Sequence, residues 1–414
     1  MESGFCIYWN LISPGWGATM EWEAIQQALQ EQGLDGWLFY DFDHRDPIAY
    51  RILGLPPERL AKRRWYYLIP AHGSPQKLVH RIESRQLDSL PGEKREYAAW
   101  EEQTTTLREM LAPFPTIAMQ YSPNNQIPYI SRVDAGTVEL IRSFGNRVVT
   151  SADLVQRFEA RWSWPALESH LEAGKLLDGI IGATFEEIGR RVGAEGATDE
   201  YAIQQFLLGQ FEKHNLVSDD PPLVAVNANS GNAHYETTRE RSAPIRAGDF
   251  VMLDVWAKRR RPGAVYYDVT WVGFLGERPP ERLHHIFSIV TRARDRAIEY
   301  VEEAVRQRRT VRGWEIDRAA RSVIEESGYG QYFPHRTGHS IGESVHGNGA
   351  NIDDLETHEE RAILPCTGFS IEPGIYLPEF GVRSEVNVYV DEQAARVTGA
   401  IQREIVRIPV ARPA

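Results

Sequence analysis

Cysteine is scarce in this chain of 414 residues, which contains only Cys6 and Cys366. Two cysteines so far apart do not suggest a disulfide framework, and a reducing cytosol is the expected compartment. Long apolar runs are also lacking, because none reaches the roughly 20 residues of a membrane-spanning helix. The first nineteen residues lack the basic start and clean apolar run of a signal peptide. We therefore expect a cytoplasmic protein with no membrane partner.

Basic residues are fewer than acidic ones, with 46 lysines and arginines against 58 aspartates and glutamates. The formal net charge is −12, whereas sequence-independent binding to nucleic acid needs a basic face. We therefore expect no nucleic-acid partner. The hydrophobic fraction of 42% and the charged fraction of 25% are those of an ordinary globular protein.

The length of the chain exceeds what one hydrophobic core usually serves, so two domains are expected. We expect a poorly structured extension over 1–19, an α/β domain over 20–161 and a second domain over 162–414. Met20 is an equally good functional start, since a helical pattern begins directly after it. The boundary rests on Pro165, because proline restricts the residue before it and favours a break between helices.

Strands alternate with helices in the first domain, which predicts an α/β layer with a partly parallel sheet. The expected strands are 36–40, 65–69, 116–119 and 147–149, and the expected helices are 21–32, 107–111 and 133–143. His44 lies in an acidic stretch from Asp41 to Asp46. We interpret this stretch as a solvated loop, because no apolar pattern buries it.

The second domain begins with a predicted helix from Leu167, and the capping-box pattern Thr184-Phe-Glu-Glu187 predicts the start of another. A third helix is expected over 199–213. Two apolar strands follow, over 250–256 and 265–271, with the basic run Lys258–Arg261 in the hairpin tip between them. The remaining expected elements are helices over 281–307 and 314–326 and strands over 369–374 and 381–390.

Three histidines fall within the twelve-residue stretch His335-Arg-Thr-Gly-His339-Ser-Ile-Gly-Glu-Ser-Val-His346. Imidazole is the commonest neutral metal ligand and titrates nearest physiological pH, so the stretch indicates a metal or proton-transfer site. His335 and His339 have the spacing of the zincin motif. Arg336 stands where that motif needs glutamate, so we reject it. A further histidine, His234, ends a polar, glycine-containing loop.

Acidic residues interrupt the apolar strands around these histidines. Asp254 and Asp268 occupy the two strands of the hairpin, where an isolated ionised carboxylate is heavily penalised. A symmetric hairpin centred on Arg261 predicts that the two aspartates face each other across the strands. Two facing carboxylates repel unless a proton or a cation lies between them.

Two glutamates and an arginine complete this set. Glu372 precedes Pro-Gly in an apolar strand, and period two places Arg383 and Glu385 on one face of their strand and the valines on the other. Each acid alone also fits a buried ion pair or an edge position. Four carboxylates with one imidazole suit manganese, cobalt, zinc or iron rather than a thiolate-bound structural zinc. Their four negative charges match two divalent ions.

As an ordered set, these motifs resemble the pita-bread metallopeptidases, which include Xaa-Pro aminopeptidases, Xaa-Pro dipeptidases (prolidases) and methionine aminopeptidases. The matching pieces are Asp254, Tyr267-Asp268-Val-Thr270, His335-Arg-Thr-Gly-His339-Ser-Ile-Gly, Ile371-Glu372-Pro-Gly374 and Arg383-Ser-Glu385. The leading α/β domain resembles that of the prolidase and aminopeptidase P branch. The resemblance implies a mixed α/β architecture, with a creatinase/prolidase-like domain followed by a pita-bread catalytic domain.

The resemblance also implies roles for single residues. Two divalent ions, Mn²⁺ first and Co²⁺, Zn²⁺ or Fe²⁺ as alternatives, would be held by Asp254, Asp268, His339, Glu372 and Glu385. Glu372 would also shuttle the proton of the metal-bridging water. His234 and His346 would position the substrate and stabilise the tetrahedral intermediate, His335 matches a further site histidine, and Arg383 would anchor the site or the substrate.

The implied reaction is hydrolysis of Xaa-Pro peptide bonds by a metal-bridging hydroxide, in a homodimer whose substrate is a peptide with proline in second position. The choice between aminopeptidase and dipeptidase stays open. The chain departs from the family pattern in a longer Asp254–Asp268 interval, in Ser344 where aspartate is common, and in Gly347 where an acid is frequent. The last two put the substrate preference in doubt.

Two alternatives stay open. One is a metal-dependent hydrolase or lyase of the same fold that acts on a small non-peptide compound. The other is a non-catalytic peptide-binding module, although such modules have typically lost ligands that this chain keeps. The intact ligand set argues against metal-free, creatinase-like hydrolysis.

Overall fold

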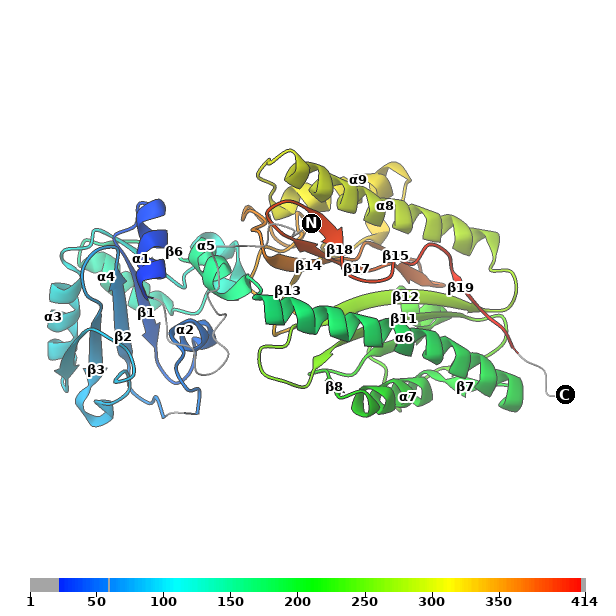
Figure 1. Cartoon of the computed structure of the whole chain (residues 1–414), viewed down its shortest axis with the longest axis horizontal. Helices are drawn as coiled ribbons and strands as arrows, with labels where there is room; N and C mark the ends of the chain where they lie inside the picture. The colour runs from blue at the N-terminus through cyan, green and yellow to red at the C-terminus, as the bar shows by residue number, and fades with distance from the viewer. Residues whose placement is uncertain (1–21, 59, 411–414) are drawn as a thin grey trace, which may run out of the picture. The chain divides into compact units, whose positions relative to one another are not determined.

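The computed structural model describes residues 22–58 and 60–410, which divide into two compact units (Figure 1). Described residues up to Glu159 form the N-terminal unit, and those from Ala160 onward form the C-terminal unit. The extension predicted over 1–19 lies outside the described residues. No helix in the described part of the chain is long and apolar enough to cross a membrane.

A six-stranded mixed sheet with helices on both faces builds the N-terminal unit. Its order is β4-β3-β2-β1-β5-β6, and the β3–β4, β1–β5 and β5–β6 pairs are parallel. The strands are β1 (Gly36–Asp41), β2 (Trp65–Pro70), β3 (Gln76–His80), β4 (Glu93–Tyr97), β5 (Thr116–Met119) and β6 (Arg147–Thr150). Successive strand residues point to opposite faces, so one sheet carries two cores. One core is covered by α1 (Trp22–Glu31), α2 (Pro47–Leu53) and α5 (Ala152–Val155), and the other by α3 (Trp100–Leu111) and α4 (Ala135–Ser143).

The stretch from Asp41 to Asp46 is only in part the solvated loop that the sequence predicted, because Asp43 and Arg45 are exposed but the aspartates at its two ends are buried. Asp41 is 1% exposed and accepts hydrogen bonds from the backbone N–H of His44 (3.1 Å) and from the Tyr50 hydroxyl (2.9 Å). Asp46 is 2% exposed and caps α2 by accepting from the Ala49 N–H (3.0 Å). Turn and cap contacts of this kind bury an aspartate without any apolar period in the sequence, which is why the pattern missed them.

The C-terminal unit places a helix pair on each side of its strands. It contains α6 (Trp164–Glu195), α7 (Glu200–Lys213), α8 (Glu281–Arg306) and α9 (Gly313–Glu326). The main strands are β9 (Leu223–Val226), β11 (Phe250–Arg259), β12 (Tyr267–Leu275), β14 (Thr367–Ile371) and β17 (Val386–Val390). Short strands extend or flank these: β7 (Thr198–Asp199), β8 (Leu216–Val217), β10 (Pro244–Ile245), β13 (Ser340–Ile341), β15 (Gly374–Tyr376), β16 (Gly381–Arg383), β18 (Ala395–Val397) and β19 (Val406–Ile408).

The β11–β12 hairpin forms the centre of this unit. One sheet has the order β19-β12-β11-β8, with β9 also paired to β11, and a second has the order β13-β14-β17-β18. Odd-numbered residues of β11, such as Leu253, pack against α6 and α7. Even-numbered residues such as Met252 face the core shared with α8, α9, β14 and β17. Asp254 and Asp268 therefore lie on the second face.

A single helix, α6, replaces the two helices that the sequence predicted over this region. Its N-cap is Ser163, which accepts from the Ala166 N–H (3.3 Å), and Pro165 lies in its first turn. Thr184 lies inside the helix, fully buried, and its hydroxyl donates to the carbonyl oxygen of Ile180 (2.7 Å). A threonine that bonds back to the preceding turn cannot cap a new one, so the capping-box pattern was misleading here.

The register of the β11–β12 hairpin also differs from the prediction. Asp254 pairs with Thr270, and Asp268 pairs with Trp256. The hairpin is therefore centred one residue later than Arg261. The two aspartates share a face, as predicted, but they are diagonal neighbours rather than direct partners.

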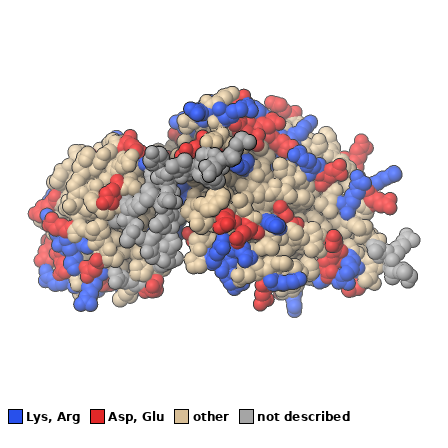
Figure 2. All heavy atoms as spheres, in the orientation of Figure 1, with Lys and Arg blue, Asp and Glu red and all other residues tan. Residues whose placement is uncertain are grey.

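The basic hairpin tip is held by contacts within its own unit. Arg259 donates to the carbonyl oxygen of His214 (2.6 Å), and Arg259 and Arg261 both pair with Glu172 (3.5 and 3.4 Å). On the face of the molecule that Figure 2 shows, acidic and basic side chains are interspersed. These contacts favour the hairpin interpretation of the run over a nucleic-acid patch.

The strand predicted over 381–390 is interrupted. It forms β16, which pairs with β15, and then β17, which pairs with β14, and Ser384 and Glu385 lie between the two. Val382, Val386 and Val388 enter the core, as their alternation predicts. The polar residues between them are buried too, so this segment has no solvent-facing side.

Candidate metal centre

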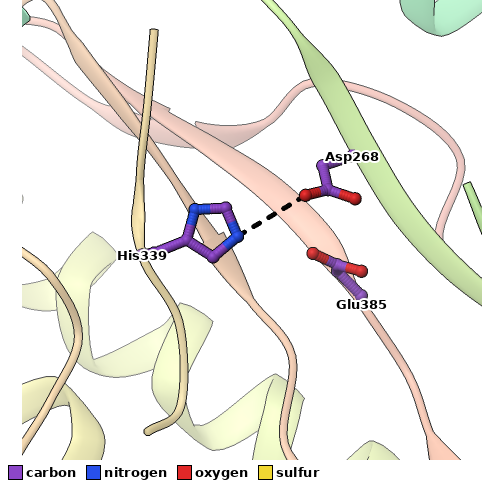
Figure 3. Close-up of side chains that lie close together, drawn as sticks. All are labelled: Asp268, His339 and Glu385. Carbon is purple, nitrogen blue, oxygen red and sulfur yellow. Dashed lines mark ion pairs between the residues drawn. The ribbon is translucent and has the colours of Figure 1, made fainter. Parts of the chain in front are cut away.

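Three side chains from distant parts of the sequence converge in the C-terminal unit (Figure 3). Asp268 lies on β12, His339 directly precedes β13, and Glu385 directly precedes β17. Each offers one ligand atom, and these atoms lie within 4.8 Å of one another. The three residues are only 5%, 4% and 3% exposed. Such a compact, buried group of two carboxylates and an imidazole can hold a metal ion.

Glu372 borders this cluster. Its Oε1 lies 3.5 Å from the Nε2 of His339, the same distance that separates this nitrogen from the Oδ2 of Asp268. The backbone N–H of Glu372 donates to the carbonyl oxygen of Thr337 (2.7 Å), and the Ser370 hydroxyl donates to its Oε1 (3.1 Å). The connection between β14 and β15 therefore holds the Glu372 carboxylate beside His339.

The hydrogen bonds of His339 define its tautomer. Its Nδ1 lies 3.1 Å from the carbonyl oxygen of Ser340, which can only accept, so Nδ1 carries the proton. Nε2 then presents a lone pair towards Asp268 and Glu372. Burial lowers the pKa of His339, although Glu372 opposes this. The imidazole is thus held neutral and oriented as a ligand, a role that such contacts to the second ring nitrogen commonly serve.

Asp254 is held at the edge of this group by two neighbours. Its Oδ1 lies 2.9 Å from the Thr270 hydroxyl, and its Oδ2 forms an ion pair with Arg383. The same hydroxyl lies 2.9 Å from the Oε2 of Glu385 and accepts from the Nε of Arg383 (2.9 Å). Thr270, on β12, therefore joins two of the predicted ligands to the predicted anchoring arginine.

The electrostatics of the four acids indicate a need for added positive charge. Burial raises the pKa of Asp268 and of Glu385 well above the usual range, and the neighbouring carboxylates add to both increases. Burial also raises the pKa of Asp254 to about 6, against the opposing charge of Arg383. For Glu372, burial raises the pKa, but favourable electrostatic interactions with the neighbouring His339 and Arg383 outweigh it and leave the pKa below its usual value. The carboxylate oxygens are hard donors, and added positive charge would stabilise their ionised forms. The group therefore fits divalent metal ions.

Two more predicted histidines lie beside the cluster. The ring of His346 is 4.3 Å from that of His339 and nearly perpendicular to it. A proton on His339 and one on His346 would repel each other, and this repulsion, followed by burial, lowers the pKa of His346 to about 3. His335 donates from Nδ1 to the carbonyl oxygen of Arg336 (2.7 Å), and burial lowers its pKa to about 4. Both imidazoles are therefore neutral at pH 7.

Tyr376 belongs to the site, although no motif in the sequence pointed to it. Its hydroxyl lies 2.8 Å from the Nε2 of His335 and 3.3 Å from a guanidinium nitrogen of Arg383. The β15–β16 pairing places Gly374 opposite Arg383, and a Cβ on Gly374 would meet the Tyr376 ring at 2.7 Å. The one available signal was this Pro-Gly step, where the glycine leaves space for the tyrosine.

Among the predicted site residues, His234 has the weakest connection to the metal cluster. It is exposed, and its backbone N–H donates to the side-chain oxygen of Asn232 (3.1 Å). Within residues 22–58 and 60–410, no hydrogen bond, ion pair or ring contact joins it to the metal cluster. An electrostatic interaction with His234 nevertheless adds to the lowering of the His346 pKa, so the two histidines are neighbours.

A model of Metallopeptidase family M24 matches residues 168–392, which is more than half of the chain. The chain belongs to metallopeptidase family M24. The matched span includes all five predicted ligands, from Asp254 to Glu385. The prediction that the chain belongs to a metallopeptidase family is therefore confirmed.

Individual M24 relatives agree with this assignment. An Xaa-Pro dipeptidase of Pyrococcus furiosus is 29% identical over 241 residues, which cover 56% of this chain and 61% of that protein. A probable dipeptidase, PepE, of Mycobacterium tuberculosis is 34% identical over 167 residues, 40% of this chain and 41% of that protein. The chain thus aligns with about two fifths to three fifths of the length of these relatives.

Solved structures extend the likeness in fold to both units. Dipeptidase PepE from Mycobacterium ulcerans matches with a TM-score of 0.70 at 22% identity, and the match covers 94% of this chain and 97% of that one. At this identity the likeness shows the fold alone. It confirms the predicted mixed α/β class, in which an α/β domain precedes the metallopeptidase domain.

Proposed function

We propose that this M24 protein is a dinuclear metal-dependent exopeptidase that hydrolyses Xaa-Pro peptide bonds. The observation that carries the proposal is the buried group of Asp268, His339 and Glu385, with Glu372 at 3.5 Å from the same imidazole nitrogen. The substrate class is supported by the names of relatives, among them the Xaa-Pro dipeptidase of Pyrococcus furiosus. The proposal covers both aminopeptidase and dipeptidase action, and a cytoplasmic homodimer stays a prediction.

Five side chains would hold the two ions: Asp254, Asp268, His339, Glu372 and Glu385. Manganese is our first choice, because four carboxylates and one imidazole form a hard donor set. When bound, two divalent ions supply a water that ionises near neutral pH and positive charge for the transition state. Without bound ions, burial and the repulsion between neighbouring carboxylates raise the pKa values of Asp268 and Glu385. Two divalent ions would offset this repulsion.

Glu372 is the proposed proton carrier. Its pKa lies below the usual value, so it is ionised at neutral pH and ready to accept a proton from the attacking water. It would then deliver this proton to the leaving nitrogen of the cleaved peptide. Its fixed position, with Ser370 donating to Oε1 at 3.1 Å, keeps the carboxylate aimed at the site.

Two histidines are the proposed substrate contacts. His346 and His234 would each donate an N–H to the oxygen that gains negative charge in the transition state. Arg383, which is bonded to Tyr376 and through it to His335, would fix Asp254 at the edge of the site.

A peptide panel tests the proposal. Metal-stripped and manganese-loaded protein would be assayed with Xaa-Pro dipeptides, longer Xaa-Pro peptides and matched peptides with alanine in second position. We expect cleavage by the loaded protein alone and a preference for proline. Equal rates on the alanine peptides would contradict the proline preference. If the loaded protein cleaves no peptide, a lyase or hydrolase acting on a small non-peptide compound becomes the better explanation.

A further inference from the structure

The segment that carries His234 needs an anchor, because it has little regular structure of its own. We define the His234 loop as residues 227–243, which connect β9 to β10 and contain only a short 3-10 turn over Asn227–Gly231. His234 itself is exposed, and its backbone N–H donates to the side-chain oxygen of Asn232. If this imidazole is to meet a substrate at a fixed place, other residues have to hold the loop.

Glu200, the first residue of α7, makes contacts that suit this task. It is completely buried. Its Oε1 accepts from the backbone N–H of Val226 (2.7 Å), just before the loop, and its Oε2 accepts from that of Ala243 (2.8 Å), at the loop's end. One carboxylate therefore bonds both ends of the loop and closes it.

The same carboxylate reaches the middle of the loop. The hydroxyl of Tyr235 donates to the Oε2 of Glu200 (2.7 Å), and the side-chain amide of Asn229 donates to Oε1 (2.9 Å) and to Tyr235 (3.0 Å). Tyr235 directly follows His234 and packs against the core. Together these hydrogen bonds restrict the backbone next to His234.

The closed loop also fits tightly against the strands that carry Arg383. The hydroxyl of Ser230 accepts from the Gly381 N–H (2.9 Å), and a Cβ on Gly231 would meet the Leu377 carbonyl oxygen at 2.3 Å. These contacts seat the start of the loop against the β15–β16 hairpin, whereas Glu200 holds its middle and its end.

We infer that Glu200 is a positioning residue, which fixes His234 through Tyr235 and Asn229 and acts on the reaction only through that histidine. The inference deepens the proposed function and rests on the role proposed there for His234. Misplacing a reacting group by about 1 Å can cost a rate of about 100-fold. Release of one of several anchors should cost less, about tenfold in kcat.

A double-mutant comparison tests the inference. Tyr235→Phe removes the hydrogen bond from the Tyr235 hydroxyl to Glu200. Glu200→Gln replaces one of the two carboxylate oxygens, so that all the donors that bond to Glu200 have to share a single acceptor oxygen. Both should lower kcat about tenfold with unchanged metal content. In a His234→Ala background neither should lower it further. Tyr300→Phe is the matched control, because it removes a tyrosine–carboxylate hydrogen bond to Glu315 (3.1 Å) elsewhere in the unit, and it should leave kcat unchanged.

Hydrogen exchange provides a second readout that needs no activity. Exchange over 227–243 should quicken in Tyr235→Phe and not in Tyr300→Phe. Losses of kcat that persist in the His234→Ala background would overturn the inference, as would unchanged exchange in the loop. If the wild type cleaves no peptide, the proposed function fails. The exchange result then decides by itself whether Glu200 holds the loop.

Discussion

His170 makes a sharp test of the packing in the C-terminal unit, because it is fully buried and held neutral. It lies on α6, where Nδ1 donates to the carbonyl oxygen of Tyr266 (2.6 Å) and Nε2 faces the Thr398 hydroxyl (2.7 Å). The Trp162 ring lies 4.8 Å away. Burial lowers the pKa of His170 from 6.5 to about 4. The folded state therefore resists a proton that the unfolded chain accepts readily.

The sign and size of the effect follow from linkage. Below pH 6.5 the unfolded state binds a proton that the native state refuses, so the free energy of unfolding falls as the pH drops, until about pH 4. One pKa unit corresponds to about 1.4 kcal/mol. A shift from 6.5 to about 4 therefore contributes roughly 3 kcal/mol in full. Between pH 7 and pH 5, about 2 kcal/mol of this should be lost.

Urea unfolding of metal-free protein at pH 7 and pH 5 measures this loss. In His170→Gln the drop between the two pH values should be smaller than in the wild type by about 2 kcal/mol. Contributions of other groups cancel in this comparison. His284→Gln, which changes an exposed histidine, should retain the full drop. Equal drops in His170→Gln and wild type would refute the reasoning, since they would mean that His170 is not held neutral by burial.

The remaining predictions concern the site. Asp254→Asn should lose bound metal, measured by elemental analysis, and retention of a full complement would contradict its role as a ligand. His339→Ala should lose metal and activity together. His346→Ala should keep its metal and lose roughly 10²–10³ in turnover, the cost of one oxyanion donor, and a loss of metal there would show that the two roles are misassigned. Tyr376→Phe should keep its metal and lower kcat by about 10- to 100-fold, because one hydrogen bond to a charged group is worth about 1.5–3 kcal/mol.

The sequence was most informative where a strong pattern coincided with a local requirement. Long amphipathic segments predicted α7, α8 and α9 closely, because each helix turns one apolar stripe towards a core. The predicted acidic ligands were recognisable for a related reason: an aspartate such as Asp268 inside an apolar strand is costly without a partner. The choice of His339 among the histidines came instead from the family resemblance.

Two of the misses have their origin in contacts that the sequence pattern does not encode. The register that pairs Asp254 with Thr270 depends on the shape of the turn. Tyr376 resembles any other buried aromatic residue until β15 is placed against β16. Thr184 failed as a cap for a local reason, because its hydroxyl bonds back to Ile180 inside a helix that continues through it.

Metal titration tests the central claim most directly. Protein stripped of divalent ions would be titrated with manganese, while bound metal and the hydrolysis of an Xaa-Pro dipeptide are followed together. We predict no turnover in the stripped protein and a rise to full turnover as two ions bind per chain. Full turnover in the metal-free protein would contradict the account.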